Sequence, residues 1–296
     1  MNIKKFFTLI LLTYFLAILS VLIFLIPVLF NLYNSAEEKL IRYQLKKIKN
    51  NNYNTIFLGD SSLGNLIDAN QWEKLSNNST GNLALFGVTS FYGAYKMLKK
   101  EEFNELKNIY VVSSIDAWNR SKSSVDPYFI ISENKIKKIF SVLNSRDFRN
   151  ISKLYLNFLN EKMGLNIDAF QIKTKLQNDY IIQNLSYKLP KNIPSEFKFR
   201  LLDDKVFYLK KIFKICEEKN LNCIFMNGII YEKFCEHTGY SEFLVNLENL
   251  LSKNRINYLE NKTCLPYEML GDAYDHLHPQ YKVEFTNKFY RLIEKN

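Results

Sequence analysis

Hydrophobic positions in this chain form one long run at the start and many short runs afterwards. Residues 6–30 contain no charged side chain, and they follow two lysines, Lys4 and Lys5. About 20 apolar residues are enough to cross a bilayer, whereas a cleavable signal peptide has a shorter apolar core and a small-residue exit. The pattern predicts an uncleaved N-terminal transmembrane helix within residues 1–33.

Basic residues flank both ends of this run, so charge alone leaves the orientation open. An N-terminal anchor after a short basic tail usually keeps that tail in the cytoplasm. We therefore expect a single-pass protein of the cytoplasmic (inner) membrane, with its domain facing the periplasm or the cell exterior. Residues 34–52 contain a predicted juxtamembrane helix at about 37–49. Its apolar positions lie along one side: Leu40, Ile41, Leu45 and Ile48.

Beyond residue 52, short β-prone runs alternate with amphipathic segments. The predicted strands are 55–58, 82–86, 108–114, 222–226 and 256–259. One predicted helix begins after Thr89 or Ser90. Three others cover residues 203–219, 241–253 and about 279–294. Short connections between strands and helices are typical of parallel βαβ units, so the fold class is α/β, with one domain at 53–296.

Residues 118–200 break this alternation, because helical periodicity continues there without strong strands. We expect a helical insertion over the carboxyl edge of the sheet. It could be a lid, a polymer-binding cap or an inert elaboration.

The composition argues against two kinds of function, nucleic-acid binding and zinc binding. The net charge is +10, but lysines are interleaved with acidic residues and form no stripe with aromatic residues, which argues against a nucleic-acid partner. The four cysteines lack the spacing of a zinc site, so we expect no metal site. We also expect no cofactor. Cys216 and Cys223 are interpreted as small buried residues, and Cys235 and Cys264 could pair if the domain is exported.

Two polar motifs at opposite ends of the domain carry the candidate chemistry. Gly59-Asp60-Ser61 follows the first predicted strand, where ligands of open α/β sheets bind, although these residues also form ordinary turns. Asp275-His276-Leu277-His278 precedes Pro279 and the last helix. A serine nucleophile needs an imidazole base and a carboxylate that orients it, and this segment contains both.

The two motifs together resemble those of the SGNH (GDSL-type) hydrolase superfamily. The first family block, Gly-Asp-Ser, is matched at residues 59–61, and the last block, Asp-x-x-His, is matched by Asp275 and His278. The glycine of the second block is matched by Gly87. The resemblance covers residues 55–296 without the insertion. It implies a flavodoxin-like three-layer parallel sheet of the SGNH type.

The third block departs from the family pattern. Family members often carry Gly-x-Asn-Asp after the third strand, and the asparagine helps to hold the oxyanion. This chain has Asp116 and Asn119 in that region, with Ser114 at the end of the strand. Asp116 would repel a developing oxyanion, whereas Asn119 or the Ser114 hydroxyl could replace the missing donor. Loss of one such donor removes about 3 kcal/mol of transition-state stabilisation.

The resemblance implies roles for the matched residues. Ser61 attacks an acyl carbonyl, His278 takes and returns the proton, and Asp275 orients His278. The backbone N–H groups of Ser61 and Gly87 meet the oxyanion, with Asn119 as the third donor.

Alternative assignments for the nucleophile and the base are Ser62 and His276. With its expected anchor and insertion, the chain is similar to the envelope acylation proteins of the DltD, AlgX and AlgJ groups. That likeness implies a serine O-acyl esterase or acyltransferase acting on a cell-envelope polysaccharide or a teichoic-acid-like polymer. Its partners would be the acylated glycan, the membrane and a membrane-bound O-acyltransferase. The alternative is a non-catalytic binding or assembly subunit on the same fold.

Overall fold

The computed structural model describes residues 3–29, 36–120, 183, 185–194, 197–261 and 263–295. Residues 1–39 and 124–171 belong to one unit of the chain, and residues 40–123 and 172–296 belong to the other, so each is described by itself. In the first unit, helix α1 runs from Ile3 to Leu29 and exposes large apolar side chains between Phe6 and Ile23. Among the residues described, no helix is both long and apolar enough to span a bilayer, so the anchor predicted for residues 1–33 is not found there.

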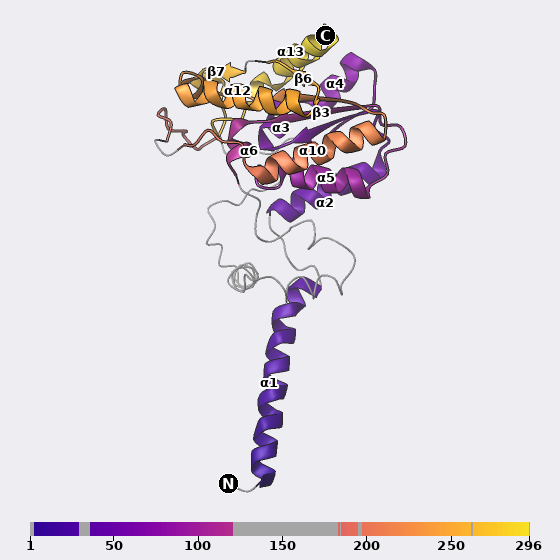
Figure 1. The fold of residues 1–296 in the computed structure, drawn as a ribbon, viewed down its shortest axis with the longest axis vertical. Helices are drawn as coiled ribbons and strands as arrows, with labels where there is room; N and C mark the ends of the chain where they lie inside the picture. The colour runs from indigo at the N-terminus through magenta and orange to yellow at the C-terminus, as the bar shows by residue number, and fades with distance from the viewer. Residues whose placement is uncertain are drawn as a thin grey trace. The chain divides into compact units, whose positions relative to one another are not determined.

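The second unit is built on a sheet of five parallel strands in the order β2-β1-β3-β4-β6 (Figure 1). Its strands are β1 (Thr55–Gly59), β2 (Thr80–Asn82), β3 (Asn108–Ser113), β4 (Asn222–Asn227) and β6 (Tyr258–Leu259). This is the strand order 2-1-3-4-5 of flavodoxin-like sheets. The predicted parallel α/β fold is therefore confirmed.

Helices cover both faces of the sheet. On one face, α4 (Ala69–Ser76) packs on α13 (Lys282–Glu294), and on the other α5 (Ser90–Lys100) packs on α10 (Asp203–Glu218) (Figure 1). Right-handed crossovers between parallel strands place the helices in this way. The other helices of the described residues are α2 (Ala36–Asn50), α3 (Ser61–Leu66), α6 (Ile115–Asn119), α11 (Glu232–Cys235) and α12 (Thr238–Lys253), with 3₁₀ turns η1 (Tyr267–Met269) and η2 (Pro279–Tyr281).

The second strand differs from the prediction, because β2 ends at Asn82, where the predicted strand 82–86 begins. The next residues still run beside β1, since the N–H groups of Leu83 and Leu85 donate to the carbonyls of Phe57 and Gly59. The side chains of residues 83–85 are fully buried. Burial in a loop, rather than a longer strand, explains the apolar run.

Two further differences concern short strands at the far end of the sheet. The predicted strand 256–259 is reduced to the two residues of β6. A small second sheet, which the sequence pattern did not predict, pairs β5 (Ile230–Tyr231) with β7 (Cys264–Leu265) in parallel.

Helix α2 covers the helix predicted at about 37–49 and contacts the second strand. Its predicted apolar side is buried from Leu40 to Ile48. The side-chain amide of Gln44 donates to the carbonyl of Ala84, and the ammonium of Lys47 donates to that of Asn82, both at 2.8 Å.

Two disulfides link the described cysteines. Cys235 in α11 is bonded to Cys264 in β7, which confirms the expected pair. Cys216 is bonded to Cys223 across the turn between α10 and β4. Both residues of this second pair are buried as expected, but their interpretation as separate small residues is wrong. The core of the predicted helical insertion, residues 121–182, lies outside the described residues.

Candidate active site

Strand β1 brings Ser61 to the carboxyl edge of the sheet. A Cβ atom on Gly59 would lie 1.8 Å from the carbonyl oxygen of Val112 in β3, so only glycine fits where β1 ends. Asp60 then caps α3, because its side chain accepts a hydrogen bond from the N–H of Ser62 at 2.7 Å. Ser61 is thus the first residue of α3, half-buried at the end of the strand.

The carboxylate of Asp60 connects the end of β1 to the end of β3. Its Oδ2 atom accepts hydrogen bonds from the N–H of Ser114 at 2.8 Å and from the hydroxyl of Ser113 at 3.0 Å. Asp60 is almost fully buried, and this burial, followed by the charge of Asp275, raises its pKa. Asp60 therefore holds the turn before Ser61 in place from inside the protein.

The histidine side of the site is a loop between η1 and η2 that closes on itself. The N–H of Gly271 donates to the carbonyl of His276 at 2.7 Å, and the N–H of His278 donates to that of Met269 at 2.9 Å. Between these bonds, the buried Leu270 and Leu277 form an antiparallel bridge. The backbone of this short hairpin sets the direction of the side chains at its tip.

The two sides meet at His276. The hydroxyl oxygen of Ser61 lies 2.9 Å from Nε2 of His276, and Nδ1 of His276 lies 2.7 Å from the Oδ1 atom of Asp272. An ionised carboxylate can only accept, so Nδ1 carries the proton and Nε2 is free to accept from Ser61. Burial alone would lower the pKa of His276, but the hydrogen bond to Asp272 and the charge of Asp275 outweigh it, so the pKa is raised.

The hydrogen bond expected between Ser61 and His278 is not the one in the structure. His278 is the N-cap of η2, and its Nδ1 atom accepts a hydrogen bond from the N–H of Gln280 at 3.4 Å. The following Pro279 occupies the first position of the 3₁₀ turn, and His278 directly before it is the cap. The alternative base, His276, is the histidine that contacts Ser61.

Asp275 also differs from its expected place. Its Oδ2 atom accepts a hydrogen bond from the hydroxyl of Ser114 at 2.7 Å, and its Oδ1 atom lies 3.8 Å from Nε2 of His276. The carboxylate is therefore next to the nitrogen that faces Ser61, and Asp272 occupies the orienting position at Nδ1. Burial is the main cause that raises the pKa of Asp275.

The alternative nucleophile, Ser62, is fully buried. A Cβ atom on Gly228 would come within 2.7 Å of its hydroxyl oxygen, so the backbone after β4 covers this side of Ser62. A substrate cannot reach this hydroxyl, whereas that of Ser61 lies at the edge of the sheet beside His276.

The third-block residues make contacts of their own. The side-chain amide of Asn119 donates to the carbonyl of Ile115 and accepts from the N–H of Arg200, both at 3.3 Å. Asp116 forms an ion pair with Arg120, whose Nε lies 2.6 Å from the carboxylate. The repulsion expected from Asp116 is thus offset by a cation that the sequence reasoning missed.

Gly87 lies next to this ion pair. A Cβ atom there would be 3.1 Å from Cδ of Arg120 and 3.6 Å from Cα of Ala117. The loop that carries Gly87 leaves β1 through the bond between Leu85 N–H and Gly59 O. On its other side, the carbonyl of Gly87 accepts a hydrogen bond from the buried Lys205.

Three residues of the site were missed from the sequence: Asp272, Arg120 and Lys205. Asp272 stands four residues before His276, whereas the Asp-x-x-His spacing of the family points to Asp275. Arg120 stands four residues after Asp116, a helical spacing that favours an ion pair and could have been read directly. Lys205 had no local signal, because only the packing of α10 on α5 brings it to the site.

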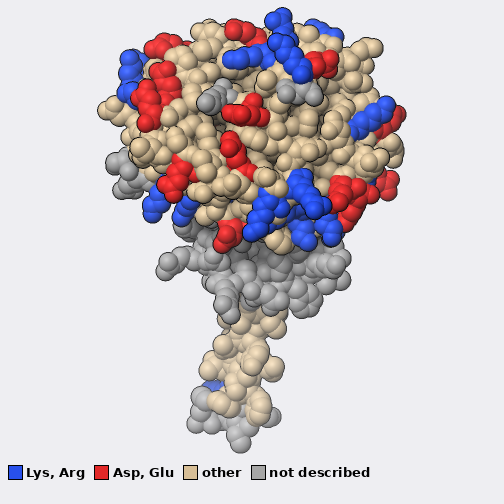
Figure 2. Space-filling model, turned by 45° about the horizontal axis from the view of Figure 1, so that its top comes forward, with Lys and Arg blue, Asp and Glu red and all other residues tan. Residues whose placement is uncertain are grey.

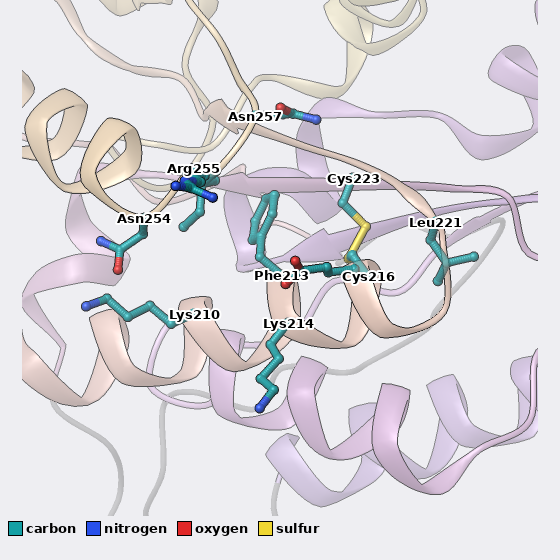
Figure 3. Close-up of a pocket in the computed structure, with 11 residues that line it drawn as sticks. Lys210, Phe213, Lys214, Cys216, Leu221, Cys223, Asn254, Arg255 and Asn257 are labelled. Carbon is teal, nitrogen blue, oxygen red and sulfur yellow. A yellow bond between two sulfur atoms is a disulfide. The ribbon is translucent and has the colours of Figure 1, made fainter.

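A pocket of about 510 Å³ lies at the opposite edge of the sheet (Figure 3). Its lining includes Leu221 and Asn257, which precede β4 and β6, and the disulfide of Cys216 and Cys223. It is therefore at the amino ends of the strands and does not belong to the serine site. In the described part of the chain, no group of three histidine, cysteine or acidic side chains could hold a metal ion.

Charged side chains are mixed on the face shown in Figure 2. Lysine and arginine occur in small groups next to aspartate and glutamate, and they form no continuous basic stripe over that face. This agrees with the interleaved charges of the sequence.

No protein-family model matches the chain. It is 25% identical over 132 residues to the DNA ligase of Borreliella afzelii (strain PKo), covering 39% of this chain and 20% of the ligase. It is 25% identical over 138 residues to the DNA ligase of Borrelia garinii subsp. bavariensis, covering 41% of this chain and 21% of the ligase. The chain thus matches only about a fifth of the length of these proteins.

Among solved structures, the chain is similar to a protein from Desulfitobacterium hafniense DCB-2 that is described as lipolytic and of the G-D-S-L family. The TM-score is 0.34 and the identity 7%, covering 80% of this chain and 98% of that protein. None of these similarities assigns the chain to a family.

Proposed function

We propose that this chain is a serine-dependent O-acyl esterase or acyltransferase of the SGNH type. The observation that carries the proposal is the continuous row of hydrogen bonds from Ser61 to His276 to Asp272, at 2.9 and 2.7 Å. Both distances are within the range expected of a nucleophile and its base, and of the base and its orienting acid. The row lies at the carboxyl edge of a parallel sheet, where ligands of such folds bind.

The reaction follows from the roles of these groups. The Ser61 oxygen attacks the acyl carbonyl while Nε2 of His276 takes the hydroxyl proton, and Asp272 stabilises the resulting imidazolium. The tetrahedral intermediate then collapses, the alcohol leaves with the proton from His276, and the acyl group stays on Ser61. Water or a second hydroxyl group attacks the acyl-enzyme by the same route in reverse, which gives hydrolysis or transfer.

Two backbone N–H groups are the proposed oxyanion donors. Ser61 is the first residue of α3, a position whose N–H has no partner within the helix. The N–H of Gly87 donates to no other group in the part of the chain that the structure describes. Arg120 supports the same role by offsetting the charge of Asp116. Asn119 is a less suitable third donor, because both ends of its amide are already engaged.

The proposed substrate is an acylated polymer of the cell envelope, and the proposed location is the extracytoplasmic side of the inner membrane. Two disulfides support an oxidising compartment, because such bonds are rare in the cytoplasm. A membrane-bound O-acyltransferase is the proposed partner, since it would supply the acyl group when transfer rather than hydrolysis takes place.

The test is covalent labelling of the purified full-length chain with a fluorophosphonate, followed by peptide mapping. We expect a single adduct on Ser61, with Ser61→Ala unlabelled and Ser62→Ala labelled like the wild type. Folded wild-type protein that stays unlabelled across pH 6–10 would reject the serine enzyme. The engaged amide of Asn119 would then favour the alternative, a non-catalytic binding or assembly subunit.

A further inference from the structure

Lys205 is a buried cation beside the proposed oxyanion loop. It is 3% exposed and lies in the first turn of α10. Its ammonium donates to the carbonyl of Gly87 at 2.5 Å and lies 3.4 Å from the hydroxyl of Ser90. Fully buried lysines are rare because desolvation of the charge is unfavourable, so this position calls for a physical reason.

Helix stability does not supply that reason. Lys205 is close to the N-terminus of its own helix, and Ser90 is the first residue of α5, so the ammonium lies at the N-terminal ends of two helices. Both ends carry partial positive charge, which disfavours a cation. A neutral side chain would join α5 to α10 without this electrostatic penalty.

The charges around Lys205 point toward the serine site. Asp204 lies on its own helix, Asp60 on the turn before Ser61, Asp116 on α6 and Arg120 at the C-terminal cap of α6. Burial lowers the pKa of Lys205 to about 8, while Asp204, Asp60 and Asp116 act to raise it and Arg120 acts to lower it. The lysine is therefore coupled electrostatically to Asp60 as well as bonded to Gly87.

We propose that Lys205 is a positioning residue of the serine site, which holds the carbonyl of Gly87 so that the Gly87 N–H faces the acyl oxygen, and whose charge stabilises the oxyanion. The inference rests on the proposed function. The loop is fixed on two sides, by Lys205 at the carbonyl and by Arg120 and Ala117 around Cα. Donors that are fixed before the reaction stabilise developing charge without reorganisation.

Because Lys205 is charged, the acylation rate and the folding stability should depend on pH in opposite directions. The ammonium loses its proton as the pH rises through about 8, so we expect the acylation rate to fall there. In the unfolded chain the same lysine holds its proton up to about pH 10.4. Between these two values the unfolded state binds more protons, so the Lys205 contribution to stability rises with pH while the rate falls.

Three variants of the full-length chain test the proposal: Lys205→Met, Lys205→Arg and the matched control Lys282→Met. Lys282 is also a fully buried lysine that donates to a backbone carbonyl, that of Gly64 at 2.8 Å, but it lies on α13. The measurements are the rate of fluorophosphonate labelling of Ser61, the hydrolysis of p-nitrophenyl acetate and the thermal midpoint, each from pH 6 to 10.

Lys205→Met should lower the labelling rate by about 10-fold at the optimum, through kcat rather than KM for the ester, and abolish the decrease above pH 8. Lys205→Arg should retain the rate within about 3-fold and stay active at pH 9–10, because guanidinium keeps its charge. Lys282→Met should lower the thermal midpoint but keep the decrease above pH 8.

Either of two results would overturn the proposal. One is a Lys205→Met variant with the wild-type rate and pH profile. The other is a Lys282→Met variant that, like Lys205→Met, loses the decrease in rate above pH 8. Lys205 would then only tie α10 to α5. A wild-type protein that is not labelled on Ser61 at any pH is a different failure. It would reject the proposed function, and with it the reaction that Lys205 is proposed to serve.

Discussion

The serine segment and the histidine loop meet at one hydrogen bond, but they are held in place by different means. The serine segment is the end of a fully buried strand, paired in register with β2 and β3 on either side. Among the described residues, the histidine loop has no strand partner in the central sheet. It is held by bonds between its own ends and by one buried leucine pair, and from outside by bonds from the N–H of Tyr231 to the carbonyl of Tyr274, from the amide of Gln183 to the carbonyl of Leu277 and from the hydroxyl of Ser114 to Asp275. The position of Ser61 is therefore set by the sheet, whereas that of His276 is set by a loop, through bonds within the loop and single bonds from its neighbours.

The largest effect expected from this comparison is the difference in acylation rate between substitutions of the two histidines. His276→Ala should lower the rate of Ser61 acylation by roughly 10⁴-fold or more, close to the effect of Ser61→Ala, because nucleophile and base act as one unit. His278→Ala should change the rate less than about 3-fold, since this ring only caps η2. Kinetics of fluorophosphonate labelling measure both. The opposite ranking would show that the loop rearranges to bring His278 to Ser61.

The two aspartates of the loop give the next largest effect. Asp272→Asn should reduce acylation by about 10²- to 10⁴-fold, because the amide no longer fixes the tautomer of His276 through Nδ1. Asp275→Asn should reduce it by about 10-fold at most, since Asp275 lies 3.8 Å from Nε2 and bonds to Ser114 instead. If Asp275→Asn proves the more damaging variant at matched stability, Asp275 is the orienting acid.

The sequence predicted the serine side because the relevant signals were local. A β-prone run followed by Gly59-Asp60-Ser61 places the serine at a strand end, whatever the rest of the chain does. The parallel order of the sheet also follows from the alternation of strands and helices. The apolar run at residues 83–86 was wrongly predicted to be a strand, because buried loops and buried strands have similar compositions.

On the histidine side, the sequence does not show which of His276 and His278 contacts Ser61. That depends on backbone bonds between residues 269 and 278, which no hydrophobic periodicity reveals. One local signal was present, since a residue directly before a proline at a helix start tends to cap its own helix. Applied to His278, this rule favours a capping role for its Nδ1 atom. Lys205 and Asp272 needed the folded structure, because tertiary packing brings the lysine and the turn of the loop brings the carboxylate.

A third prediction contrasts one glycine from each region by its effect on stability. Gly59→Ala should destabilise the fold by about 3 kcal/mol, because the new methyl group meets backbone, the carbonyl oxygen of Val112 at 1.8 Å. Gly271→Ala meets only the side-chain end of Gln183, at 1.6 Å, which can move at the loss of its bond to the carbonyl of Leu277. That loss should amount to about 1 kcal/mol.

Urea unfolding of both glycine variants measures the difference. A larger effect at Gly271 than at Gly59 would contradict the view that the sheet, and not the loop, is the rigid half of the site. Val112→Ala is a suitable control for the first variant. It removes side-chain volume in β3 but leaves the carbonyl oxygen that a methyl group on residue 59 would meet.

The smallest predicted effect comes from the buried carboxyl pair that links the two regions, Asp60 from the serine side and Asp275 from the loop. Ser114 lies between them, with its hydroxyl 2.7 Å from Asp275 and 3.4 Å from Asp60. Burial raises the pKa of both groups, and the charge of Asp275 raises that of Asp60 further. A carboxyl group with a raised pKa in the fold binds its proton more tightly than in the unfolded chain. Its contribution to stability is therefore full below about pH 4 and is lost as the pH rises through the raised pKa.

Asp275→Asn should weaken this dependence, because it removes one of the two charges and keeps an oxygen that can accept from Ser114. We expect the wild type to lose on the order of 1 kcal/mol more than the variant between pH 4 and pH 7. Urea unfolding at several pH values measures this, with Asp203→Asn, an exposed position at the start of α10, as the control that removes a carboxyl group without relieving burial. Parallel stability curves for the wild type and Asp275→Asn would mean that the charges of Asp60 and Asp275 do not interact. The serine segment and the histidine loop would then be coupled only through the bond between Ser61 and His276.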